Sequence, residues 1–114
     1  MAYVPRNNAI VDKSFHFACD IVIYTQSLKS NGFYEIGGQL LKSGTSIGAN
    51  IRESQRAVST KDFKNKLGIA LKEAEETQYW MQIIEHTGIA SVPQELPGNC
   101  EELIKLLVSI IKNS

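Results

Sequence analysis

The segment from Thr60 to Thr87 reads TKDFKNKLGIALKEAEETQYWMQIIEHT, and its apolar residues recur with a seven-residue period. Their spacing alternates between four and three residues, which places them on one stripe of an α-helix. Ser59 followed by Asp62 resembles a capping box, and Gly88 is typical of a helix C-terminus. We therefore expect a helix over residues 60–87, about 42 Å long at 1.5 Å per residue. The stripe consists of Phe63, Leu67, Ala70, Ala74, Thr77, Met81 and Ile84.

Two segments on the N-terminal side show the same helical period. Four glycines lower the helix propensity of residues 33–57, but the repeated apolar pattern outweighs that cost. The helix predicted over residues 33–57 has core positions at Ile36, Leu40, Gly44, Ile47 and Ile51. The helix predicted over residues 10–29 has core positions at Val11, Phe15, Ala18, Val22 and Thr25.

A fourth helix is predicted to begin at Asn99, where Glu102 would complete a capping box. The connection before it, residues 88–98, contains Pro93 and Pro97. No segment alternates cleanly enough for a β-sheet. The sequence therefore predicts a single all-α domain over residues 1–114, an antiparallel up-down-up-down four-helix bundle with long second and third helices. The apolar positions of the fourth helix are Leu103, Leu106, Leu107, Ile110 and Ile111.

The composition of the 114 residues is that of one compact domain, with 43% hydrophobic and 21% charged residues. Twelve basic and twelve acidic side chains give zero formal net charge, which excludes a globally basic binder of polyanions. Cys19 and Cys100 are expected to be free thiols in a reducing cytoplasm. Met1–Arg6 lacks the apolar run of a signal peptide, and Leu103–Ile111 is too short to span a bilayer. We therefore expect a cytoplasmic protein with no membrane association.

Charge is distributed unevenly along the chain. Residues 42–72 contain seven basic and two acidic side chains, whereas residues 73–102 contain seven acidic side chains and no lysine or arginine. Because the second and third helices are antiparallel, the basic residues gather at the end of the bundle that holds the 57–59 turn. A nucleic-acid site at this end would contact phosphates independently of sequence and would weaken with salt. The candidate nucleic-acid-binding residues are Lys42, Arg52, Arg56, Lys61 and Lys64.

Two other interpretations of the charge pattern stay open. The basic region of one copy could contact the acidic region of the next, in a heterologous contact that can close into a ring. Both regions are also typical of ordinary solvent-exposed helix faces. Phe63 is the only aromatic residue among the basic ones, and it belongs to the predicted core stripe. A stacking platform for single-stranded nucleic acid is therefore not predicted.

Small and polar side chains form a second stripe on the predicted helix 33–57, beside its core positions. This stripe is a candidate oligomer interface, and an ordinary polar flank is an equally good interpretation. Gly44 and Gly48 lie one turn apart and would allow a neighbouring helix to approach closely. The stripe consists of Gln39, Ser43, Ser46, Asn50 and Glu53.

The sequence contains no recognisable motif for catalysis or metal binding. His16 and Asp20 lie four residues apart beside Cys19, but no second pair would supply the remaining ligands. Glu73 and Glu76 lack the Glu-x-x-His pairs of di-iron bundles. No phosphate-binding glycine loop or nucleophile elbow is found. We therefore expect no enzymatic activity, no catalytic residue, no metal site and no cofactor.

Three blocks of the chain carry a resemblance to a known family. They are residues 13–18 (KSFHFA), residues 39–53 (QLLKSGTSIGANIRE) and residues 61–80, where KDF, LGIALKEAEET and YW match. In these blocks the chain is similar to the small four-helix bundle proteins encoded in intervening sequences of 23S ribosomal RNA genes. That family is related to the accessory variability protein of diversity-generating retroelements.

The resemblance implies an antiparallel four-helix bundle that assembles into a homopentameric ring and has no known enzymatic activity. The retroelement relatives are basic and associate with nucleic acid and a reverse transcriptase, whereas this chain has zero net charge. The match over residues 39–53 supports a packing or interface role for Ser43, Ser46, Asn50 and Glu53. We expect a bacterial, non-catalytic, homo-oligomeric scaffold with RNA as the first partner to test. The alternative is a protein–protein adaptor that binds no nucleic acid.

Overall fold

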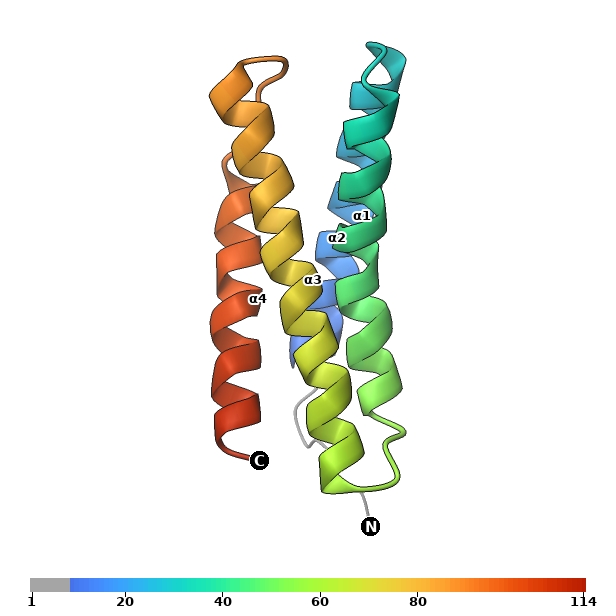
Figure 1. Ribbon diagram of the computed structural model, residues 1–114, viewed down its shortest axis with the longest axis vertical. Helices are drawn as coiled ribbons and strands as arrows, with labels where there is room; N and C mark the ends of the chain where they lie inside the picture. Colours follow the sequence, from blue (N-terminus) through green and yellow to red (C-terminus); the bar gives the residue numbers. More distant parts are fainter. Residues whose placement is uncertain (1–8) are drawn as a thin grey trace.

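The computed structural model describes residues 9–114 as four antiparallel α-helices (Figure 1). The helices are α1 (Ala9–Ser30), α2 (Tyr34–Ser54), α3 (Thr60–Thr87) and α4 (Glu95–Lys112). The described residues contain no strand, so the predicted all-α class is confirmed. The expectation about Met1–Arg6 concerns residues outside the described range.

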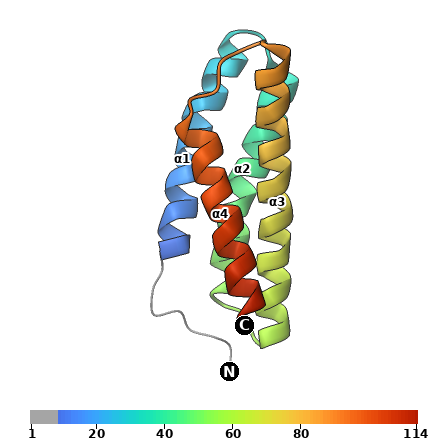
Figure 2. The same ribbon diagram turned by 90° about the vertical axis from the view of Figure 1, so that its left-hand side faces the viewer.

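The helices form a square in which each one packs against its neighbours in sequence, and α1 packs against α4 to close the bundle (Figures 1 and 2). The molecule is a rod 48 Å long and 19 Å across. At its lower end in Figure 1, α1 and α3 begin and α2 and α4 end. The α1–α2 side and the α3–α4 side lie on opposite faces of the square.

Helix α3 has the predicted bounds, and its start and end signals are confirmed. The Ser59 hydroxyl accepts a hydrogen bond from the Asp62 backbone N–H at 3.0 Å, which satisfies one free donor of the first turn. The Asp62 carboxylate accepts from the backbone N–H of Val58 rather than from that of Ser59. Gly88 ends the helix with a φ of +70°, a conformation that glycine adopts without strain. All seven residues of the predicted apolar stripe are buried.

The predicted core stripe of α1 is wrong by one position along the helix. Phe15 and Val22 are exposed, and Val11 and Ala18 are only half-buried, so Thr25 alone of that stripe is fully buried. The buried stripe was missed because it contains a serine, Ser14, at a position where an apolar residue is expected. The Ser14 hydroxyl donates to the Val11 carbonyl, so the serine is buried without an unpaired polar group. The buried residues are Ile10, Ser14, Phe17, Ile21, Thr25 and Leu28.

The glycines of α2 select this register of α1. A Cβ atom on Gly44 would lie 2.9 Å from Cγ2 of Ile21, and one on Gly48 would lie 3.3 Å from the Ser14 carbonyl oxygen. The absent side chains therefore let Ile21 and Ser14 of α1 reach the backbone of α2. Helix α2 keeps all its glycines within one unbroken helix, although it ends at Ser54 rather than at the predicted position 57.

Helix α4 begins at Glu95, four residues before the predicted start, so the capping box of Asn99 and Glu102 is wrong. Pro97 lies in the first turn, where its missing N–H removes no intrahelical hydrogen bond. Leu103 and Leu107 are buried as predicted. Leu106, Ile110 and Ile111 are half-buried against the core. No helix among residues 9–114 has the length and apolar content needed to cross a bilayer.

Candidate functional site

The lower end of the bundle carries most of the predicted basic site. Arg52 lies in the last turn of α2, Arg56 in the loop that follows, and Lys61 and Lys64 in the first two turns of α3. Arg52, Arg56 and Lys61 are exposed, and Lys64 is half-buried. The short α2–α3 connection brings these four residues to one end because it reverses the chain within five residues.

The four residues do not share one face of that end. The guanidinium carbon of Arg52 lies 5.5 Å from the centre of the Phe15 ring, so Arg52 is on the α1–α2 side. Lys64, Leu71 and Gln78 follow one another at seven-residue intervals and therefore lie on one stripe of α3. Gln78 lines a hollow together with Pro97 and Glu101 of α4. Lys64 therefore lies toward the α3–α4 side.

Lys42 is separate from the lower end. It precedes Arg52 by ten residues, which is about 15 Å along the helix axis. Lys42 lies toward α3, close enough to Glu73 to act on its pKa. Partial burial and Glu76 raise the pKa of Glu73, whereas Lys72 and Lys42 lower it. Arg52 lies over Phe15 of α1, so Lys42 and Arg52 are directed toward different neighbouring helices.

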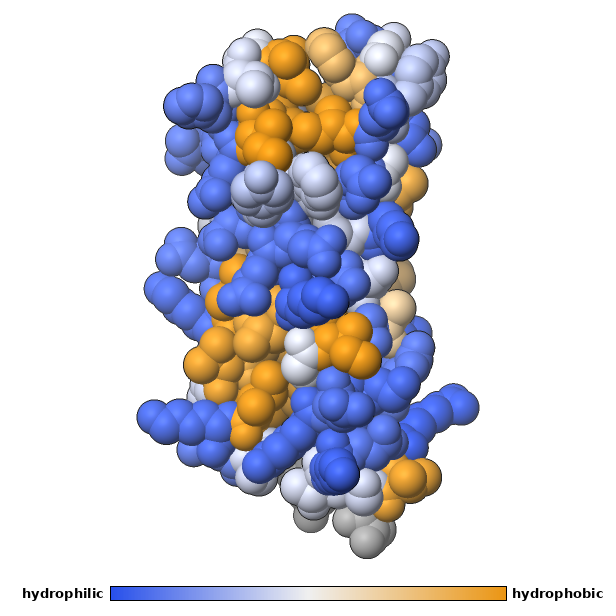
Figure 3. All heavy atoms as spheres, in the orientation of Figure 1, coloured by the Kyte–Doolittle hydropathy of each residue, from blue (hydrophilic) through white to orange (hydrophobic). Residues whose placement is uncertain are grey.

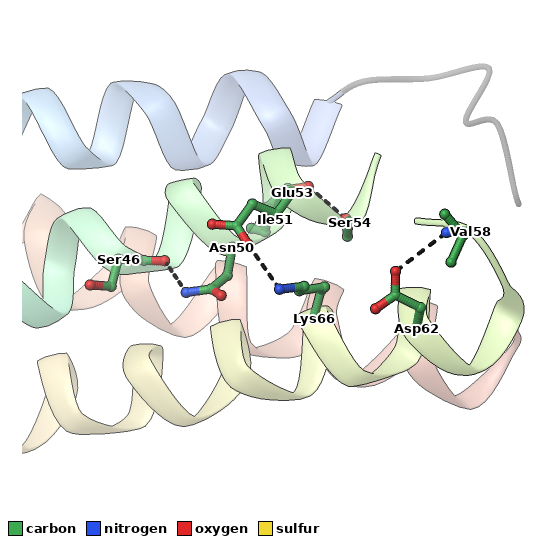
Figure 4. Close-up of polar contacts among 8 residues, drawn as sticks. All are labelled: Ser46, Asn50, Ile51, Glu53, Ser54, Val58, Asp62 and Lys66. Carbon is green, nitrogen blue, oxygen red and sulfur yellow. Dashed lines mark hydrogen bonds and ion pairs between the residues drawn. The ribbon is translucent and has the colours of Figure 1, made fainter. Parts of the chain in front are cut away.

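An ion pair between α2 and α3 also engages one basic side chain near this end. Lys66 Nζ lies 2.9 Å from Oε1 of Glu53 (Figure 4). The hydrogen bond to Glu53 raises the pKa of Lys66 above its usual value. Lys66 was absent from the predicted site, and Glu53 was predicted only as an interface residue. Their pairing depends on the register of α2 against α3, for which the sequence carries no local signal.

The small polar stripe of α2 divides between the core and the surface. Ser43 is 2% exposed and lies 2.9 Å from the Thr77 hydroxyl of α3, so it lies inside the subunit and outside any surface offered to a partner. Asn50 donates to the Ser46 carbonyl at 2.9 Å, and both side chains are half-buried (Figure 4). Gln39 and Glu53 are exposed. These four surface residues follow the flank of α2 that faces α3.

Large apolar side chains are exposed on α1 and on α4. On α1 the exposed residues are Phe15 at 49%, Val22 at 39% and Ile23. On α4 Val108 is 48% exposed, and Ile104 beside it is half-buried. On the face that shows α3 in front, apolar patches lie toward both ends, separated by a hydrophilic belt (Figure 3). Contiguous exposed apolar patches mark contact sites more often than isolated surface residues do.

The residues of α1 that were considered for catalysis or metal binding are exposed to solvent. His16, Cys19 and Asp20 all point outward from α1. Within residues 9–114, no group of three or more histidine, cysteine, aspartate and glutamate side chains could hold a metal ion. Cys100 is buried, and its thiol donates to the Ala74 carbonyl at 3.3 Å, which gives it a packing role between α3 and α4.

The sequence model of the 23S rRNA-intervening sequence protein family matches residues 6–109. The chain belongs to this family. A member of the S23 ribosomal protein family from Bacteroides thetaiotaomicron, a crystal structure described as a protein with unknown function, is 44% identical. The match covers 90% of this chain and 98% of that chain, with a TM-score of 0.87. No curated protein matches the chain.

Family membership confirms the resemblance seen in the sequence blocks, and the structural match supports the four-helix arrangement. The surface feature that sequence reasoning missed is the pair formed by Phe15 and Arg52. The apolar period of α1 assigned Phe15 to the core, so no exposed aromatic residue was expected beside the basic ones. The signal that could have revealed it is the glycine pair of α2, because that pair favours the stripe containing Ile21.

Proposed function

We propose that this member of the family is a non-catalytic, homo-oligomeric scaffold in the bacterial cytoplasm that binds RNA through the lower end of its bundle. The observation that supports RNA binding is the clustering of Arg52, Arg56, Lys61 and Lys64 at one end of the rod. Apart from Asp62, the acidic residues of α3 and α4 lie between the middle of the rod and its other end. They are Glu73, Glu75, Glu76 and Glu85 of α3 and Glu95, Glu101 and Glu102 of α4. A neutral chain can thereby present a locally positive surface to phosphates.

The test is an electrophoretic mobility shift with a structured RNA at about 50 mM and 200 mM salt. We expect a shift at the lower salt that weakens several-fold or more at the higher salt, because binding to phosphates releases condensed counterions. The double variant Arg52→Glu, Arg56→Glu should lose the shift. The matched control Lys29→Glu, Lys72→Glu makes the same change in net charge away from the lower end and should retain it. No binding by the wild type at low salt would overturn the proposal.

The second candidate function is an adaptor that binds other proteins and no nucleic acid. The exposed apolar side chains Phe15, Val22 and Val108 favour it, because such residues suit protein contacts. In that case the Arg52→Glu, Arg56→Glu variant would disturb assembly or a protein partner, and no RNA would bind at any salt concentration.

A further inference from the structure

Phe15 and Arg52 form an exposed pair at the lower end of the α1–α2 side. The guanidinium carbon of Arg52 lies 5.5 Å from the ring centre, within the range of a cation–π contact. Phe15 keeps 49% of its surface exposed with Arg52 in this position. The ring of His16 meets the Phe15 ring edge-on, with 5.7 Å between ring centres. The aromatic ring therefore contacts Arg52 and His16 and stays open to solvent.

Two arginines outweigh one nearby acidic side chain at this pair. Arg56 lies four residues after Arg52, beyond the end of α2, and is exposed in the loop. Asp12, the acidic residue nearest in sequence on α1, lies one turn before Phe15. Arg52 therefore contacts the ring, and Arg56 follows four residues later in the chain. None of the ion pairs formed by residues 9–114 involves either arginine.

An exposed ring beside cationic groups is the arrangement that binds unpaired bases. Bases of single strands stack on aromatic rings and on guanidinium planes, while neighbouring basic side chains contact the backbone phosphates. In a duplex the bases are already stacked and their faces are not accessible. We propose that Phe15 and Arg52 form a stacking platform for an unpaired base, so that the protein prefers single-stranded RNA segments. This inference rests on the RNA binding proposed above and specifies the form of RNA.

The exposed apolar stripe of α1 offers a matched control. Val22 lies seven residues after Phe15 on the same stripe, is 39% exposed and carries no ring. A contact with a second copy of the chain would use Phe15 and Val22 together, because both face the same side. A base-stacking platform would use Phe15 and Arg52 only. Substitutions at the two apolar positions therefore distinguish RNA from a second copy as the occupant.

The experiment measures fluorescence anisotropy of a labelled 12-nucleotide oligouridylate and of a labelled 12-base-pair RNA duplex, at low salt. Phe15→Ala and Phe15→Leu should each weaken oligouridylate binding about 5- to 150-fold, the range for loss of one stacked base. Duplex binding should change less than about twofold, because phosphate contacts remain. Phe15→Tyr keeps a ring and should retain wild-type binding of both probes. Val22→Ala should leave both affinities unchanged.

The failures of this inference and of the proposed function are distinguishable. If the wild type binds both probes and Phe15→Ala weakens neither, the stacking platform is wrong and RNA binding stands. Equal losses on both probes, or rescue by leucine, would likewise overturn stacking. If Phe15→Ala and Val22→Ala both reduce the particle mass in light scattering, the side belongs to a subunit contact instead. If the wild type binds neither probe, the proposed function and this inference both fail.

Discussion

At the scale of single residues, the two cysteines show how position changes chemistry. Cys19 is exposed on α1, whereas Cys100 is fully buried between α4 and α3. Burial raises the pKa of the Cys100 thiol to about 12, and Glu101 adds to the rise. The thiolate is the reactive form of cysteine, so Cys100 stays protonated and unreactive in the folded protein at neutral pH.

We therefore predict that a thiol reagent such as Ellman's reagent modifies Cys19 alone in the native protein at pH 8, and both cysteines after denaturation. Because the folded pKa of Cys100 lies above the unfolded one, its contribution to stability is complete below about pH 8.5. That contribution falls as pH rises toward 12. Cys100→Ala should flatten part of this decline in the free energy of unfolding. Native Cys100 reacting as fast as Cys19 would contradict the prediction.

At the scale of elements, α3 could be predicted completely because all its signals are local. Its cap, its apolar stripe and its terminal glycine lie within residues 59–88. Helix α1 could not, because it carries two apolar stripes and the glycines of α2 decide between them. The start of α4 was missed because Pro97 and Gly98 resemble a connection, yet both are tolerated in a first turn.

The close approach of α1 and α2 gives a prediction about stability. Gly44→Ala should lower the free energy of unfolding by about 1–3 kcal/mol, because the new Cβ would overlap with the fully buried Ile21. Gly38→Ala on the same helix meets nothing within 4 Å. It should raise the free energy of unfolding by about 0.5–1 kcal/mol through helix propensity. Urea denaturation measures both, and equal effects at the two glycines would refute the packing argument.

At the scale of the whole molecule, the sequence predicted that basic residues gather at one end but not how they are arranged there. The antiparallel turn follows from chain order, so Arg52, Arg56, Lys61 and Lys64 reach the lower end in any up-down bundle. Which side each one takes depends on how the helices are rotated against one another. That rotation puts Arg52 over Phe15, pairs Glu53 with Lys66 and buries Ser43. None of these contacts is encoded within a single helix.

Self-association is the prediction that belongs to this scale. Light scattering at about 10 μM should give a mass of several 12.7 kDa subunits, and the family resemblance implies five. The predicted contact is the polar flank of α2, where Ser46 is half-buried. Ser46→Arg should therefore reduce the particle mass. Gln26→Arg, at an exposed position of α1, should leave the particle mass unchanged. A wild-type particle of 12.7 kDa would count against the oligomeric scaffold.

The slender shape of the subunit has a consequence for any assembly in which copies stand side by side with parallel axes. A rod 48 Å long and 19 Å across that carries Arg52 and Arg56 at one tip would then bring those tips together on a common rim. If the proposed RNA binding holds, a strand bound at one tip would stay at high local concentration for the next, so individually weak contacts would combine into avidity. Affinity would then grow with the length of the strand until it reached around the rim.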